Sequence, residues 1–235
     1  MKFIYQIIFL LIIQTTMAND FEKATQLFQQ NKFDEAQVLF EKYLAINPNH
    51  TKTIEYLGDI AGARKDWDLA LIYYKRIKNQ YPSNAEYVYK YGGVLGMQAK
   101  EANKFRALSM LDEVEQCFLT AIKLDKFHIE ARMALVFLYM ELPAIIGGSE
   151  RKANKYADEI NQISKIDGLL AKGVIDEYNK NYTQAEKKYL VAMSLDDSYV
   201  KTYQKLFDLY SLKIKNPTKA ANIKQKMSQL NSNKQ

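Results

Sequence analysis

The sequence predicts an all-α repeat protein of about six helix hairpins. The first observation is that several different side-chain types recur after 34 residues. The aromatic Phe33 is followed by Trp67 at this offset, and Pro48 is followed by Pro82. A fixed period of this length is typical of a solenoid, in which one helical unit is stacked repeatedly. The second observation is that apolar residues within each unit recur at spacings of three, four and seven, which is one face of a helix. A stack of this kind offers an extended surface, so the predicted class of function is binding.

The first 18 residues have the features of a secretory signal peptide. Lys2 gives the N-terminus a positive charge, and residues 3–13 form an apolar run. Residues 16–18, which end at Ala18, have small side chains at the two positions that a signal peptidase recognises. The apolar run is shorter than the roughly 20 residues that a membrane-spanning helix needs. We therefore expect an exported, periplasmic protein whose mature chain begins at residue 19. An uncleaved segment 1–18 that anchors the protein is the alternative.

Residues 51–84 form the clearest repeat. A first amphipathic helix ends before a polar turn at residues 64–66, and a second helix begins near Trp67. Pro82 ends the second helix, because proline cannot continue a helix. Small residues are expected where the two helices cross, since the distance between helix axes depends on the side chains at the contact.

This unit resembles the tetratricopeptide repeat. The family has a small residue at its eighth position, aromatic residues at its seventeenth and twenty-fourth, alanine at its twentieth and proline near its thirty-second. The matching residues here are Gly58, Trp67, Tyr74, Ala70 and Pro82. The resemblance implies a right-handed superhelical solenoid over residues 19–230, with repeats at about 17–50, 51–84, 85–128, 129–165, 166–199 and 200–230. The residues expected to pack the repeats are Ala36, Gly58, Ala70, Gly92, Ala153, Gly173 and Ala185.

The third and fourth repeats depart from the pattern. The third is longer than one period, and residues 99–111 contain neither Gly nor Pro, which predicts longer helices rather than a long loop. The fourth is interrupted at residues 143–149, where two glycines allow a tight turn and Ser149 caps the next helix. Its apolar residues 144–146 must fold back onto the stack or meet a partner.

The sixth repeat closes the predicted stack. Asn216 is expected to cap the final helix and Pro217 to be its first residue, a combination that favours helix initiation. The polar residues 231–235 are expected to form a disordered tail.

The resemblance also implies where a partner binds, because first helices line the concave face in this family. Aromatic and methionine side chains dominate that face, and they bury large areas of variable shape. We expect an apolar polypeptide segment there, such as an amphipathic helix; packing between repeats is the alternative role for any one residue. The cationic clamp of chaperone-binding members is absent, since Phe21 and Thr25 occupy its places. The expected groove residues are Tyr56, Asp59, Tyr89, Lys90, Gly93, Met97, Met133, Phe137 and Tyr178.

Positive charge is concentrated at the end of the chain. The net charge is +6, and residues 200–235 hold eight lysines against a single aspartate. One interpretation is a solvated last repeat that keeps the end of the stack soluble. The other is contact with an anionic membrane surface or an acidic partner. The residues expected to make that contact are Lys213, Lys215, Lys219, Lys224 and Lys226.

The sequence favours a non-enzymatic protein without metal or cofactor. His50 and His128 lie far apart and have no set of neighbouring ligands, and Cys117 has no histidine partner, so it is expected to be a small buried hydrophobe. Export argues against nucleic acid as a ligand. The predicted function is therefore an exported scaffold or adaptor that binds a protein or peptide, with envelope assembly as one form. A peripheral envelope protein that docks on the membrane through its lysine-rich last repeat is the alternative.

Overall fold

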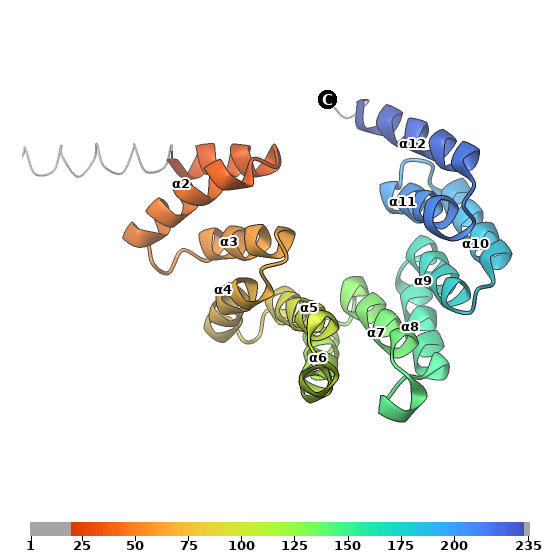
Figure 1. The fold of residues 1–235 in the computed structure, drawn as a ribbon, viewed down its shortest axis with the longest axis horizontal. Coiled ribbons are helices and arrows are strands. Elements are labelled where there is room, and N and C mark those ends of the chain that lie inside the picture. Colours follow the sequence, from red (N-terminus) through yellow and green to blue (C-terminus); the bar gives the residue numbers. More distant parts are fainter. Residues whose placement is uncertain (1–19, 233–235) are drawn as a thin grey trace, which may run out of the picture. The chain divides into compact units, whose positions relative to one another are not determined.

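A computed structural model describes residues 20–232, which form helices joined by short turns and contain no strand (Figure 1). This confirms the all-α prediction. A helical segment at 20–29 precedes the first labelled helix. The elements after it are α2 (Phe33–Ile46), α3 (Thr51–Ala63), α4 (Trp67–Gln80), α5 (Ala85–Glu101), α6 (Lys104–Leu124), α7 (Ile129–Glu141), the 3-10 helix η1 (Ala144–Ile146), α8 (Glu150–Ile163), α9 (Lys165–Tyr178), α10 (Tyr182–Leu195), α11 (Val200–Asp208), the π-helical turn η2 (Leu209–Lys213) and α12 (Pro217–Ser232).

The helices divide into two compact units, and the boundary falls inside α6, after Cys117. The first unit contains the described residues up to Cys117, and the second begins at Phe118.

Three sequence predictions concern the chain as a whole or its ends. The right-handed superhelix implied by the resemblance involves both units and stays a prediction. The predicted signal peptide, residues 1–18, lies outside the described residues. At the other end α12 continues to Ser232, so helix covers the first part of the predicted tail.

Caps define the turns between consecutive hairpins. The imidazole Nδ1 of His50 accepts a hydrogen bond from the Thr53 backbone N–H at 3.3 Å, and that of His128 accepts one from Ala131 at 3.2 Å. Burial lowers the pKa of His50, which favours the neutral ring that can accept such a bond. The two histidines therefore have the structural role that the sequence predicts. Asn84 and Ser164 cap the corresponding starts of α5 and α9.

Turns inside the hairpins use a left-handed residue. Asn31, Lys65 and Lys180 have φ angles of 58°, 61° and 60° at matching places in three repeats. After this turn, Asp66 caps α4 by accepting a hydrogen bond from the Leu69 backbone N–H at 3.1 Å. The polar turn at residues 64–66 thus lies where the sequence predicts it.

Glycine in one helix meets a tyrosine ring from the other at two hairpin crossings. A Cβ on Gly58 would lie 2.9 Å from Cε2 of Tyr74, and a Cβ on Gly173 would lie 2.2 Å from Cε1 of Tyr189. Both tyrosine rings are buried. The helices can approach this closely only because glycine has no side chain at the contact. The predicted packing residues are all buried: Ala36, Gly58, Ala70, Gly92, Ala153, Gly173 and Ala185.

The irregular middle of the chain is helical, apart from short breaks. The helices α5 and α6 have 17 and 21 residues, as the absence of Gly and Pro between residues 99 and 111 predicts. In the fourth repeat, Gly147 has a φ angle of 107°, and a Cβ on Gly148 would lie 1.8 Å from the Leu142 carbonyl oxygen. Both glycines are therefore required by the turn. Ile145 is 93% exposed, so this apolar side chain does not fold back onto the helices, whereas Ile146 is only 37% exposed.

Two further features follow from burial and hydropathy. Cys117 is buried, and burial raises the pKa of its thiol, which disfavours the reactive thiolate.

Of the helices between residues 20 and 232, none has the combination of length and apolar character that crossing a bilayer requires.

The substitution Gly173→Ala is expected to destabilise the second unit. Its Cβ would overlap the Tyr189 ring, which is fully buried and cannot move aside easily. Overpacking of this kind costs about 1–3 kcal/mol. Urea unfolding followed by circular dichroism would measure the loss.

The matched control is Gly93→Ala, where an added Cβ meets nothing within 4 Å. Because alanine is the better helix former, this variant should gain about 0.5–1 kcal/mol. Equal responses of the two variants would contradict the assignment of Gly173 to a close helix contact.

Candidate binding cavity

The first unit contains an open cavity of about 300 Å³ between α3, α4 and α5. Tyr74 contributes from α4, and all the other lining residues come from α3 and α5. Five of the nine groove residues expected from the sequence lie here. The lining residues are Gly58, Asp59, Gly62, Tyr74, Tyr89, Lys90, Gly93, Val94 and Met97.

Glycines keep the cavity open. A Cβ on Gly93 would meet nothing within 4 Å, and one on Gly62 would meet only the Trp67 ring at 3.9 Å. Neither glycine is therefore required for helix packing, in contrast to Gly58 on the same wall. Met97 is 40% exposed and Tyr89 is half-buried, so apolar surface is presented at the opening. Tyr89 and Met97, next to a cavity that the glycines leave open, are suited to contacting an apolar group of a ligand.

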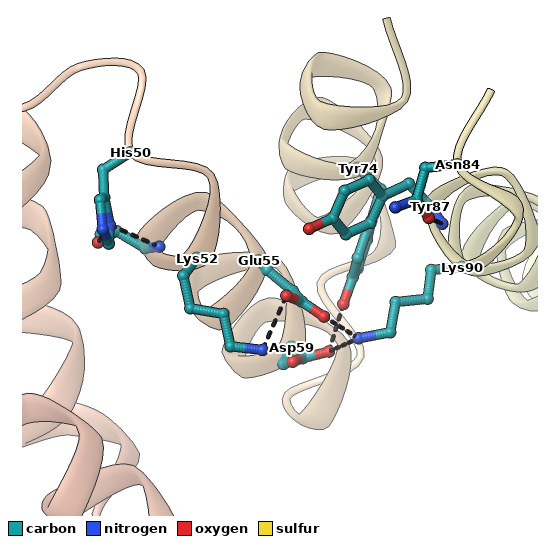
Figure 2. Close-up of polar contacts among 9 residues, drawn as sticks. His50, Lys52, Glu55, Asp59, Tyr74, Asn84, Tyr87 and Lys90 are labelled. Carbon is teal, nitrogen blue, oxygen red and sulfur yellow. Dashed lines mark hydrogen bonds and ion pairs between the residues drawn. The ribbon is translucent and has the colours of Figure 1, made fainter. Parts of the chain in front are cut away.

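A charged network lies along one side of the cavity, with Glu55 at its centre (Figure 2). The Glu55 carboxylate is paired with the ammonium of Lys52 at 2.9 Å and with that of Lys90. Lys90 also lies 3.8 Å from a carboxylate oxygen of Asp59, which accepts a hydrogen bond from the hydroxyl of Tyr74. Two lysines and two carboxylates balance here. The cavity wall therefore presents a positioned lysine whose charge is already compensated.

The two carboxyl groups of this network are perturbed in opposite directions. Burial by itself raises the pKa of Glu55, but hydrogen bonds from Lys90 and Lys52 outweigh it and hold that pKa below its usual value. Burial raises the pKa of Asp59, and the hydrogen bond from Tyr74 opposes this effect only in part. Burial and the neighbouring Asp59 carboxylate raise the pKa of Tyr74, so its hydroxyl stays protonated as a donor.

The remaining expected groove residues lie elsewhere. Tyr56 packs inside the first unit, where its ring stacks on Phe40 with centroids 4.8 Å apart and an interplanar angle of 14°. Met133 is half-buried in the second unit. Phe137 and Tyr178 line a second cavity of about 230 Å³, together with Val174, Glu177, Lys205 and Lys213. Seven of the nine expected groove residues therefore lie at two separate cavities, one in each unit, and Tyr56 and Met133 line neither of them.

The five lysines expected to contact an anionic surface are all exposed, but they differ in their surroundings. Lys219 is paired with Glu186 at 2.6 Å, and Lys213 lines the second cavity. On a helix of 3.6 residues per turn, Lys224 and Lys226 lie on opposite sides of the apolar stripe of α12. The lysines thus form no single flat basic face on this helix, and the membrane contact stays a prediction.

Sequence reasoning missed some of the residues that form these cavities. Gly62 is the twelfth residue of its repeat, a position that lines the groove in the family, so its register could have identified it, whereas Val94 lies next to Gly93 and carries no distinctive signal. Lys205 is the sixth residue of the last repeat, a position that lines the groove in the family, and this offset could have identified it. Among residues 20–232, no three His, Cys, Asp or Glu side chains are grouped so that they could hold a metal ion.

The succession of helix hairpins is that of the tetratricopeptide-repeat fold, and solved structures of such proteins superimpose on the chain. A thermophilic tetratricopeptide protein of Thermus thermophilus gives a TM-score of 0.66 at 14% identity, covering 83% of this chain and 100% of that one. PilW, a type IV pilus biogenesis factor, gives 0.60 at 14% identity, covering 93% of each chain. PilF of Pseudomonas aeruginosa gives 0.54 at 16% identity, covering 92% of each.

No protein-family model and no curated protein sequence matches the chain. The likeness to solved structures therefore establishes the fold, while the ligand has to be inferred from the cavities themselves.

The substitution Glu55→Gln is expected to remove part of the pH dependence of unfolding. Because the ion pairs lower the folded pKa of Glu55, its contribution to stability is complete above the unfolded pKa of about 4.3. That contribution is lost as the pH falls further, through the lower folded value. The stability difference between wild type and the variant should therefore be largest near neutral pH and shrink in acid, as measured by urea unfolding across pH.

Asp59→Asn provides the control of opposite sign. The raised pKa of Asp59 means that its ionised form disfavours folding, and acidification removes this cost in the wild type. The free energy of unfolding of the variant, relative to that of the wild type, should therefore be highest near neutral pH. A Glu55→Gln effect that stays constant over the acid range would rule out the ion-pair explanation.

Proposed function

We propose that this chain is a non-catalytic binding module that holds a polypeptide segment in the cavity of its first unit. The observation that carries this proposal is the open hollow over Gly93, with Tyr89 and Met97 beside it. The family resemblance of the sequence predicts the same three residues at groove positions of the repeat. A surface of rigid aromatic and adaptable methionine side chains is suited to binding apolar protein segments.

The chemistry of the cavity favours an apolar anchor residue from the partner. Lys90 and Asp59 at the wall already form ion pairs or hydrogen bonds, so they offer little to a charged ligand. The volume of about 300 Å³ is at the lower end for small-molecule sites. It suits one or two side chains that project from a longer segment, with the remaining contacts made outside the cavity.

A finer form of the proposal is that the protein is exported and serves in assembly of the cell envelope. The signal-like residues 1–18 support export. The fold shared with the pilus biogenesis factor PilW supports an assembly role by analogy alone. If the protein is exported, the intact mass of the protein recovered from a periplasmic extract should correspond to a chain that starts at residue 19. Recovery of the uncleaved chain in the membrane fraction would support the anchored alternative.

The alternative of membrane docking through the last repeat has weaker support. Its lysines are exposed, but those of α12 lie on both sides of the helix, and Lys219 is paired with Glu186. Interaction with an anionic surface requires charges that can face it together.

Filling the cavity of the first unit should weaken the binding of peptides that are anchored there. The variant Gly93→Leu places a side chain in the empty space above Gly93 and favours the helix, so the fold is expected to be retained. A random-peptide phage library selected on the full chain supplies the probes. Losing burial of one apolar anchor costs about 1.5–3 kcal/mol, so affinities should fall by about tenfold or more.

The matched control is Gly93→Ala, which adds one methyl group and leaves most of the hollow open. It should keep affinity within a few-fold of the wild type. If the selected peptides bind Gly93→Leu as tightly as the wild type, the cavity of the first unit is not the binding site and the proposal is wrong.

A further inference from the structure

The cavity of the second unit differs from the first in its charge. Phe137 of α7 and Val174 and Tyr178 of α9 supply its apolar walls. Lys205 of α11 and Lys213 of η2 lie at the same cavity. All the lining residues belong to the second unit, so the site does not depend on how the two units are placed.

The π-helical turn brings Lys213 to this cavity. Leu206, Leu209 and Tyr210 are buried, and in a regular helix the residue after them on the same stripe would be residue 213. A lysine at that place would be driven into the core. Instead, the Ile214 backbone N–H donates to the Leu209 carbonyl at 2.9 Å, which adds one residue to the turn. Ile214 then packs on the core, and Lys213 is exposed at the cavity.

The two lysines have no carboxylate partner among residues 20–232. The ammonium of Lys205 lies 5.1 Å from the centre of the Phe137 ring, which positions it without neutralising it. Other lysines of this unit are paired: Lys201 with Glu130 at 3.1 Å, and Lys172 with Asp158 at 2.9 Å. Lys205 and Lys213 therefore bring two cations without a carboxylate partner among the described residues to one cavity.

One carboxylate also lines the cavity, and it is already engaged. Glu177 accepts a hydrogen bond from the hydroxyl of Tyr189 at 2.5 Å. The hydroxyl of Tyr178 donates to Glu141 at 2.7 Å, so its ring rather than its polar end is available to a ligand. Two ammonium groups face one engaged carboxylate, which leaves an excess of positive charge next to apolar walls.

We propose that the second cavity binds an acidic side chain of a polypeptide, with a neighbouring apolar residue against Phe137 and Val174. This rests on the proposed function as a polypeptide-binding module and adds the chemical class of a second recognition point. Charge complementarity selects the carboxylate, because Lys205 and Lys213 can both approach it. The apolar walls select an aliphatic or aromatic neighbour.

The test uses a random-peptide library whose peptides are joined to the coat protein through their C-termini, so that no terminal carboxylate is free. Selection is carried out on the full chain and, in parallel, on Gly93→Leu, in which the first cavity is filled. Selected peptides are then synthesised with each acidic residue unchanged or replaced by its amide. Their affinities are measured for the wild type and for the double variant Lys205→Gln/Lys213→Gln.

The expected result is enrichment of Asp or Glu beside an apolar residue in both selections. The double variant should lose about tenfold in affinity for the acidic peptide and little for its amide, which is the signature of a direct pair in a double-mutant cycle. Raising the salt concentration should weaken binding of the acidic peptide to the wild type. The control is Lys224→Gln/Lys226→Gln, which removes the same charge from exposed positions of α12 and should change affinity by less than about twofold.

Three results obtained with recovered peptides would overturn this inference. They are peptides without acidic enrichment in the selection on Gly93→Leu, an equal loss in the α12 control, and an equal loss for acidic and amide peptides. Failure of the proposed function looks different: peptides selected on the wild type would then bind Gly93→Leu undiminished, whatever their response to the lysine variants. No recovery of peptides on Gly93→Leu would also count against the second cavity.

Discussion

Contact between a helical glycine and a buried tyrosine ring is the constraint on which both cavities depend. Gly58 receives the ring of Tyr74, and Gly173 receives that of Tyr189. Each contact brings the two helices of a hairpin together, and each tyrosine hydroxyl then reaches a carboxylate on the facing helix. Tyr74 donates to Asp59, and Tyr189 donates to Glu177. The residue that closes the hairpin thus also orients a carboxylate at the neighbouring cavity.

The same glycine–tyrosine contact is accompanied by different charges at the cavities of the two units. In the first unit, Lys90 extends from α5 to Glu55 and Asp59, so the charges at the cavity wall compensate one another. In the second unit, α11 supplies Lys205, and the π-helical turn turns Lys213 outward. Neither has an acidic partner among the described residues. One repeat architecture therefore provides a neutral, apolar cavity in the first unit and a cationic one in the second.

Much of the fold could be predicted from the sequence, because it depends on local rules. The recurrence of Ala36 and Ala70, the proline after α4 and the capping residues before α8 and α12 are short-range signals. The boundary between the units inside α6 has no such signal, because a continuous helix crosses it. A regular helical period would have carried η2 on as α-helix and placed Lys213 in the core, so the exposure of that lysine depends on tertiary packing.

The candidate site was predictable in position but not in extent. Tyr89, Lys90, Gly93 and Met97 follow from the register of the repeat, since first helices present the same positions to the same side. Tyr56 has an equally suitable register, yet its ring stacks on Phe40 because the first hairpin offers a large aromatic neighbour there. Register alone cannot distinguish an open position from one covered by the preceding repeat. The size of the side chains in the neighbouring hairpin decides between them.

Separation into two units has a consequence for recognition. The stability of a stacked repeat is approximately a sum of terms within each repeat and at the interfaces with its neighbours. The cavity at Gly93 and the cavity at Phe137 have no lining residue in common, and each is formed by residues of one unit. Changes at one cavity should therefore leave the packing of the other unaltered, and each cavity can vary its chemistry without loss of the fold. This independence is the property that suits the chain to the binding role proposed for it.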